Sequence, residues 1–333
     1  MPRTLARLLM AAGLLLGASA ALPGAERITL MVGGIDKIIY LPVKLADRLG
    51  YFANEGLDVE LRSEWSGIHG ADMLLVGSVQ GVVGFYDHTL YMQAQGKAVV
   101  SVVQFAQAPG EVELVSTRLS GIRGMADLKG HALGVTGLGS STQFLSRHLV
   151  LSAGLKLNQV SFVPVGTGDA FIEAMNRGTI HAGMTTEPTA SRLLNTGSAR
   201  VLVVDLRTPE DTAQALGGPY PASCLYMQTA WVSRHKPEVQ KLANALVRAL
   251  RYIQNHTAAE IASEMPAEFY AGDKGVYVKA LARSKPIFIP DGRMPASGPA
   301  NVLRILARTE KSIQGKTLDL GSTYTLEFVN AVK

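Results

Sequence analysis

The chain contains a single cysteine, Cys224, among its 333 residues, so it cannot form an intramolecular disulfide. Aromatic residues make up only 6% of the sequence, and its lysines and arginines are scattered, which argues against a nucleic-acid-binding surface. After residue 25, no apolar run approaches the length of a membrane-spanning helix. Stability must therefore come from buried apolar side chains, and a chain of this length can form two domains.

The sequence also lacks the common catalytic and metal-binding motifs. Its seven histidines lie far apart, without His-x-x-x-His or Cys-x-x-Cys spacing, so a metal site would need tertiary convergence. A serine hydrolase would need a Gly-x-Ser-x-Gly turn, which is absent, and a lone cysteine in an apolar strand is typical of core packing. We therefore expect no metal, no cofactor and no enzymatic activity.

The N-terminus has the layout of a secretory signal. Arg3 and Arg7 precede the apolar run Leu8–Leu16, and Ala18-Ser19-Ala20 supplies small residues for cleavage. The run is shorter than a spanning helix, so we predict a signal peptide over residues 1–25, cleaved near residues 20–25. Removal of Arg3 and Arg7 lowers the formal net charge from +5 to +3. The mature protein is expected to be exported.

Strands and helices alternate over the first part of the mature chain. The apolar patterns predict strands at Ile28–Val32, Leu57–Leu61, Val82–Phe85 and Val99–Gln104, with helices at Tyr40–Gly50, Ala71–Leu75 and His88–Gln95. This order indicates a mostly parallel, doubly wound sheet.

A second alternating set follows Gly110. It predicts strands at Val112–Ser116, Ala132–Val135, Val160–Val165, Ile180–Met184 and Arg200–Asp205, with helices between them. Pro209, Gly217-Gly218-Pro219 and Pro221 then predict a loop. A strand at Ser223–Gln228 and C-terminal helices, the longest opening at Pro237, are expected to return to the first sheet. The predicted α/β clamshell has a first lobe from residues 26–110 and 208–333 and a second from residues 111–207.

The stretch from Gly137 to Leu145 follows a predicted strand and opens a helix. The first turn of a helix has free N–H groups and a partial positive charge, so a ligand with an anionic group could bind there. Gly139 would leave the backbone accessible. The hydroxyls of Ser140, Ser141 and Thr142 can cap the helix, contact a ligand, or do both.

Several motifs in order give the chain a family resemblance. They are Tyr40-Leu-Pro-Val-Lys-Leu-Ala, Gly50-Tyr-Phe, Glu55-Gly-Leu-Asp-Val-Glu-Leu61, Ala126-Asp-Leu-Lys-Gly130, Gly139-Ser-Ser-Thr142, Ala153-Gly-Leu155, Arg177-Gly-Thr-Ile180 and Glu187-Pro188. The chain resembles the periplasmic substrate-binding proteins of ABC transporters for nitrate, sulfonates, taurine and thiamine pyrimidines. The resemblance implies a type II binding-protein fold, a periplasmic monomer, a small-molecule ligand and an inner-membrane permease as partner.

The resemblance also implies ligand contacts from loops at the carboxyl ends of strands, where open α/β sheets bind ligands. The matching segments are Gly34–Tyr40, Tyr86-Asp87-His88, Gly139–Thr142 and Thr185-Thr186-Glu187. Within them, the eleven predicted contacts are Lys37, Tyr40, Tyr86, Asp87, His88, Gly139, Ser140, Ser141, Thr142, Thr185 and Glu187. Lys37 and the helix start favour an anion, whereas Asp87 and Glu187 favour an amine or N–H donors. Tyr40 and Tyr86 could stack on a planar ligand.

The ligand itself stays open at this point. A sulfonate, another anion, a zwitterion, an amino-pyrimidine and an aromatic carboxylate all suit these residues. The chain also departs from the family where an acidic residue commonly stands, because it has Gln80-Gly81 and His181 there. An exported sensor with the same clamshell and a pyrimidine-handling enzyme of related fold are further alternatives.

Overall fold

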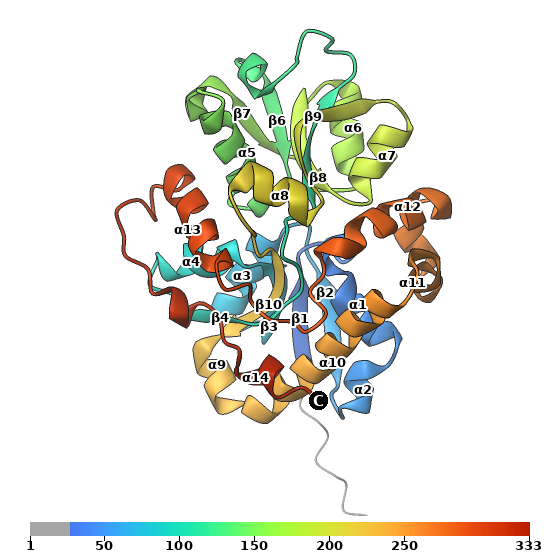
Figure 1. Cartoon of the computed structure of the whole chain (residues 1–333), viewed down its shortest axis with the longest axis vertical. Coiled ribbons are helices and arrows are strands. Elements are labelled where there is room, and N and C mark those ends of the chain that lie inside the picture. Colours follow the sequence, from blue (N-terminus) through green and yellow to red (C-terminus); the bar gives the residue numbers. More distant parts are fainter. Residues whose placement is uncertain (1–26) are drawn as a thin grey trace, which may run out of the picture.

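The computed structural model describes residues 27–333, and the signal peptide predicted for residues 1–25 lies outside them. Two five-stranded sheets with flanking helices form two lobes, one above the other (Figure 1). Lobe 1 contains the sheet with strand order β2-β1-β3-β10-β4, and lobe 2 the sheet with order β7-β6-β8-β5-β9. The two-lobed α/β fold predicted from the sequence is confirmed.

In each sheet four strands run in one direction and the fifth runs against them. The parallel strands of lobe 1 are β1 (Ile28–Val32), β2 (Val59–Ser63), β3 (Gly81–Phe85) and β4 (Val99–Gln104), and the antiparallel strand is β10 (Ser223–Gln228). In lobe 2 they are β6 (Ala132–Val135), β7 (Ser161–Pro164), β8 (Ala182–Thr186) and β9 (Ala199–Leu206), with β5 (Glu111–Ser116) antiparallel. Both antiparallel strands directly follow a passage of the chain from one sheet to the other.

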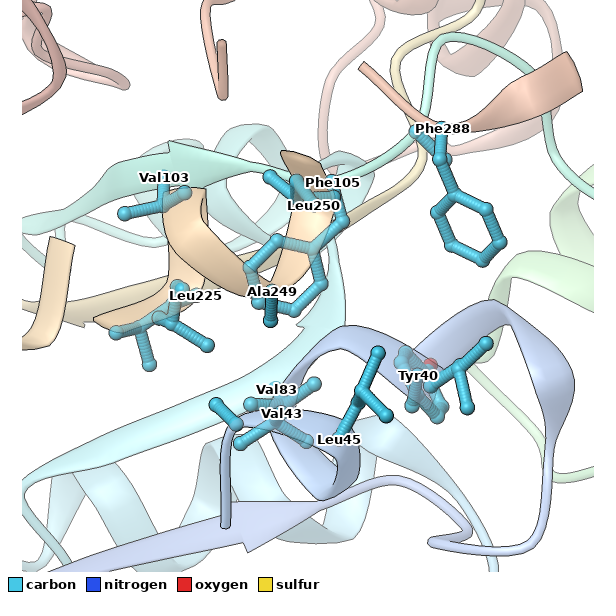
Figure 2. Close-up of a cluster of buried hydrophobic side chains, with 14 of the residues drawn as sticks. Tyr40, Val43, Leu45, Val83, Val103, Phe105, Leu225, Ala249, Leu250 and Phe288 are labelled. Carbon is cyan, nitrogen blue, oxygen red and sulfur yellow. The ribbon is translucent and has the colours of Figure 1, made fainter. Parts of the chain in front are cut away.

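The lobe 1 core forms where helices pack on one face of its sheet. The helices there are α1 (Leu41–Arg48), α2 (Tyr51–Asn54), α10 (Lys236–Asn255) and α14 (Glu327–Asn330). Figure 2 shows Val43 of α1, Ala249 of α10 and Leu225 of β10 in one buried cluster. Helices cover both faces of the sheet, so its parallel strands expose no face to water. For this reason β1 and β3 are continuous apolar runs in the sequence.

The opposite face of the lobe 1 sheet carries α3 (Gly67–Leu75) and α4 (Asp87–Gln93), and α9 (Thr229–Arg234) follows β10. Lobe 2 has three main helices, α5 (Ser141–Ser152), α6 (Asp169–Arg177) and α7 (Thr189–Asn195). Short 3-10 turns complete the connections at Ile38–Tyr40, Met125–Leu128, Leu157–Gln159, Ala267–Tyr270, Lys285–Ile287 and Leu320–Ser322.

The segment predicted as a loop after Arg207 contains a helix, α8 (Pro209–Leu216), so that prediction is wrong. The Thr208 hydroxyl accepts a hydrogen bond from the Asp211 amide, Pro209 takes the first helical position, and Gly217 ends the helix with φ of 71°. Proline suits the first position of a helix, because the amide N–H that it lacks would have no hydrogen-bond partner within the helix. Its fixed φ also fits the first turn. α8 packs against β9 of lobe 2.

The C-terminal helices contact both lobes. They are α11 (Ala258–Glu264), α12 (Lys274–Ser284) and α13 (Gly298–Thr309). α12 packs against α7 and α13 packs against α5, so the C-terminal region touches lobe 2 as well as lobe 1. Arg147 of α5 forms an ion pair of 2.8 Å with Glu310, the residue that follows α13. Among residues 27–333, no helix combines the length and apolar character needed to cross a membrane.

Candidate functional site

The loop after β1 brings a lysine into the space between the lobes. Lys37 is 4% exposed, and its ammonium donates hydrogen bonds to the carbonyls of Gly33 at 2.6 Å and Trp65 at 3.1 Å. Gly33 itself lies against Gly67, where an added Cβ would sit 2.7 Å from the backbone. Burial lowers the pKa of Lys37 to about 8, although Asp36 and Glu111 oppose that shift. The structure thus holds a buried amine that loses its proton easily.

A second group of buried polar side chains comes from the start of α4, from β10 and from the segment that precedes β10. Tyr220 donates a hydrogen bond of 2.9 Å to Asp87, and the Tyr226 hydroxyl lies 3.3 Å from Nδ1 of His88. Burial raises the pKa of Asp87 to about 7. Burial and the nearby Lys37 lower the pKa of His88 to about 3, so its imidazole is neutral at physiological pH.

The start of α5 is a capped helix end, as its sequence indicates. The Ser140 hydroxyl accepts a hydrogen bond from the Gln143 amide at 3.5 Å and donates one to the Gly137 carbonyl at 2.6 Å. Thr142 joins the same network, with its hydroxyl 2.7 Å from that of Ser140 and 3.0 Å from that of Thr136. The helix cap that the sequence analysis gave as one possible role of this turn is therefore confirmed.

An acidic residue that the sequence analysis did not name lies at this helix start. Glu111, the first residue of β5, is 1% exposed, and its Oε1 accepts a hydrogen bond of 2.7 Å from the Ser141 hydroxyl. Burial raises the pKa of Glu111 to about 8, and the neighbouring Asp87 contributes in the same direction. The carboxyl group of the protein itself thus faces the helix start where an anion was expected.

These elements enclose a small cavity between the lobes. Its lining comes from Lys37, Ile39, Tyr40, Gly67, Phe85 and His88 of lobe 1 and from Glu111, Thr136, Ser140, Ser141, Thr142 and Thr186 of lobe 2. Its volume of about 10 Å³ is roughly that needed for one water molecule. Within the described chain, His88 Nε2, Glu111 Oε2 and Thr186 Oγ1 are buried without a hydrogen-bond partner. We call this the inner cavity.

Six of the eleven residues predicted from the sequence line the inner cavity, namely Lys37, Tyr40, His88, Ser140, Ser141 and Thr142. Asp87 lies beside it, with its Oδ1 3.8 Å from His88 Nε2. Gly139 faces Ile68 of lobe 1, where an added Cβ would be 3.5 Å away.

The other three predicted residues are buried elsewhere. Tyr86 pairs with the Thr323 hydroxyl, and Thr185 is fully buried in β8. The Glu187 carboxylate binds Arg207 at 2.5 Å and accepts a hydrogen bond of 2.9 Å from the Ser191 hydroxyl. In this conformation the partners of the Glu187 carboxylate are therefore other side chains of the protein.

Glu111 and Thr136 are polar lining residues that the sequence analysis missed, whereas Thr186 lies in a segment that the family resemblance had implied. Thr136 and Thr186 stand at the carboxyl ends of β6 and β8, where the rule for open α/β sheets would have placed them. Glu111 stands at the amino end of β5, which reaches the same edge because β5 runs antiparallel. Its signal in the sequence was the pair Glu111 and Glu113, two acids on one face of an otherwise apolar strand.

Residues 27–333 contain no cluster of three or more histidine, cysteine or acidic side chains that could hold a metal ion. Cys224 is fully buried in β10, and burial raises the pKa of its thiol.

Comparison with known proteins identifies the chain's family. Residues 39–259 match the family model described as NMT1/THI5 like. The chain belongs to the NMT1/THI5-like family. A solved structure from Bordetella bronchiseptica RB50 is 36% identical to it, with a TM-score of 0.88 over 91% of this chain and 96% of that one.

More distant relatives of this NMT1/THI5-like chain share its fold. The alkanesulfonate-binding protein SsuA from Xanthomonas axonopodis pv. citri, solved with MOPS bound, is 19% identical, with a TM-score of 0.73 over 92% of this chain and 100% of that one. The protein YtlA of Bacillus subtilis (strain 168) is 22% identical over 265 residues, which span 74% of this chain and 72% of YtlA. The fold is that of the periplasmic binding proteins.

Proposed function

We propose that this protein is the solute-binding component of an ABC importer. It would capture a small anionic or zwitterionic organic ligand between its lobes in the periplasm and deliver it to a permease in the inner membrane. The observation that carries the proposal is that one cavity is lined by Lys37 of lobe 1 and by Glu111 and the start of α5 of lobe 2. Family membership and the shared fold point the same way.

The polar side chains around the inner cavity favour a ligand with both an anionic group and hydrogen-bond donors. Lys37 and the N-terminus of α5 attract an anionic group, since the helix dipole places partial positive charge there. Glu111 and Asp87 accept hydrogen bonds from an amine or from N–H donors. A zwitterion such as an amino-sulfonate uses both sets, and an anion uses the first.

The mechanism is capture by lobe closure. A ligand that bridges the lobes stabilises the closed state through contacts that exist only in that state. The polar atoms of His88, Glu111 and Thr186 that lack partners would then be satisfied by the ligand. Catalysis is not part of the proposal, because the buried Cys224 thiol has a raised pKa and is a poor nucleophile.

The test is to purify the exported protein, release any copurifying small molecule by denaturation and identify it by mass spectrometry. Isothermal titration of the refolded protein with that compound, and with a panel of sulfonates, amino-pyrimidines and aromatic acids, then measures binding. We expect one-to-one binding of an anionic or zwitterionic compound that is recovered unchanged. Failure of the whole panel to bind, or conversion of the compound to a product, would refute the proposal.

A further inference from the structure

A larger chamber lies directly outside the inner cavity, between the same two lobes. It has a volume of about 260 Å³ and is lined by Trp65 and His69 of lobe 1 and by Thr136, Gly137, Leu138, Pro164 and Gly166 of lobe 2. Thr136 lines both this chamber and the inner cavity, so the two spaces adjoin at that residue. We call this the outer chamber. None of its lining residues is among the eleven contacts predicted from the sequence, although Gly137 and Leu138 belong to the stretch that was proposed there to bind an anionic group.

Exposed apolar side chains cluster at the outer chamber. Among the side chains that the structure describes, three large apolar ones are exposed, Trp65 at 61%, Val76 at 77% and Leu138 at 54%. Two of these three line the chamber, and they come from opposite lobes. Exposed apolar side chains that cluster around a hollow commonly mark a binding surface.

The backbone shape of lobe 2 leaves room for the Trp65 indole. Gly166 has φ of 72°, and a Cβ added there would lie 4.0 Å from Cε3 of Trp65. A Cβ at Gly137 would lie only 2.8 Å from the Ser66 hydroxyl. Side chains at these two positions would therefore narrow or close the gap between the lobes.

The indole is also held in place. Its Nε1 donates a hydrogen bond to Nδ1 of His69, and the backbone carbonyl of Trp65 accepts the hydrogen bond from Lys37. The rings of Trp65 and His69 lie with their centroids 5.6 Å apart at an interplanar angle of 43°. Because His69 holds the indole and Lys37 holds the Trp65 backbone, the ring loses little conformational entropy when a ligand packs on it.

The two volumes decide where a ligand fits. The inner cavity, at about 10 Å³, holds roughly one water or one small polar group, whereas a cavity of about 150 Å³ already accommodates benzene. The outer chamber at about 260 Å³ has room for one ring with a substituent. It falls short of the roughly 300–1,000 Å³ typical of sites for drug-sized molecules.

We infer that the ligand carries a single aromatic ring, which packs on Trp65 and Leu138 in the outer chamber, and a small polar head group directed past Thr136 toward the inner cavity. This inference rests on the proposed function and narrows its ligand class. Trp65 and Leu138 then select for the ring, while Lys37 and Glu111 select for the head group.

The test uses fluorescence of Trp65. The chain has two tryptophans, so Trp231→Phe leaves Trp65 as the sole source of tryptophan emission. Single-ring sulfonates, carboxylates and amines are titrated at up to millimolar concentration, each beside a ringless analogue with the same head groups, such as 3-aminobenzenesulfonate beside taurine. We expect at least one ring compound to shift Trp65 emission to shorter wavelength and to bind about tenfold or more tightly than its analogue.

Two variants and one control locate the effect. Trp65→Ala and Leu138→Ala should remove the advantage of the ring compound while leaving the affinity for the ringless analogue within about twofold. Val76→Ala, which truncates a still more exposed apolar side chain outside the chamber, should change neither affinity. Because all three side chains are exposed, their truncation should leave the thermal transition in place.

The inference is overturned if no ring compound shifts the emission, or if Trp65→Ala binds ring and ringless compounds like the parent. Small-angle scattering of the same mixtures separates this result from failure of the proposed function. If only ringless compounds compact the protein, the inference that the ligand carries an aromatic ring is refuted, while solute capture is retained. No compaction by any compound of the panel refutes both.

Discussion

Lys37 carries its amine in surroundings where a charged group is costly. Its side chain is almost completely buried, and two backbone carbonyls are its hydrogen-bond partners. Such a group is retained at a cost to stability, which an anionic ligand would offset by pairing with it. Tyr40 adds an aromatic ring with its centroid 5.9 Å from the ammonium.

We therefore expect Lys37→Met to weaken binding of an anionic or zwitterionic ligand by about 10- to 100-fold, the usual loss of one charge-assisted hydrogen bond. Lys44→Met on α1 is the matched control, because Lys44 pairs with Asp47 outside the cavity. Since the pKa of Lys37 is about 8, affinity in the parent protein should also fall as the pH rises above that value. Equal affinities of parent and Lys37→Met in isothermal titration would contradict this role.

Glu113 is a second buried acid of β5, outside the inner cavity. It accepts a hydrogen bond of 2.6 Å from the Ser146 hydroxyl, and burial raises its pKa from 4.5 to about 8. The folded protein therefore keeps this proton at pH values where the unfolded chain has lost it. The stability that this group contributes is complete below pH 4.5 and is lost as the pH rises through about 8.

For that reason Glu113→Gln should flatten the decline in Tm between about pH 5 and 8, because glutamine has no proton to lose. Glu173→Gln, at an exposed position of α6, serves as control and should leave the profile unchanged. Thermal unfolding followed by circular dichroism at several pH values measures both. A Glu113→Gln profile parallel to that of the parent would show that this carboxyl does not titrate as described.

The residues that follow parallel strands could be predicted, whereas contacts between residues distant in the sequence could not. Lys37 and Ser140 could be proposed because each follows a strand that the apolar pattern defines. The pairing of Glu187 with Arg207 depends on residues 20 positions apart that meet only in the fold. Glu111 was missed because nothing local reveals that β5 runs antiparallel.

At the scale of elements, α5 combines a structural cap with a place in the cavity lining. Ser140 caps the helix and also lines the inner cavity. N-cap hydroxyls contribute about 1 kcal/mol to stability. Truncating a residue that both caps a helix and binds a ligand should lower the stability of the protein and its affinity for the ligand.

We expect Ser140→Ala to lower the free energy of unfolding by about 1 kcal/mol and to weaken ligand binding in addition. Thr257→Ala provides the matched comparison, since Thr257 caps α11 away from the lobe interface and accepts a hydrogen bond of 3.2 Å from the Glu260 amide. It should show the stability loss alone in denaturant unfolding. If both variants bind ligand like the parent, Ser140 acts only as a cap.

Most elements were visible in the sequence because each has a strong apolar period and a clear stop. β4 and β10 begin and end where the pattern predicts, and both are buried between layers of helices. α8 was missed because two glycines and three prolines lie near it, although Thr208-Pro209-Glu210-Asp211 is a regular helix start. Proline indicates a break inside a helix but favours its first turn, and only the neighbouring residues distinguish the two.

At the scale of the whole molecule, the two lobes meet closely. The Ile38 amide donates a hydrogen bond of 3.1 Å to the Glu187 carbonyl across the interface, and Gly137 and Gly139 approach residues 66–68. The C-terminal helices reach lobe 2 through α12 and α13 (Figure 1). The order of elements predicted two lobes, but this degree of closure depends on side-chain fit and could not be predicted.

The central claim is that ligand binding shifts the protein toward this closed arrangement, and small-angle X-ray scattering with and without ligand tests it most directly. The account predicts that the ligand-saturated protein scatters like the structure described here, with a smaller radius of gyration than the free protein. The change should saturate at the same ligand concentration as the heat in titration calorimetry. A radius of gyration that stays constant while calorimetry shows full binding would contradict capture by lobe closure.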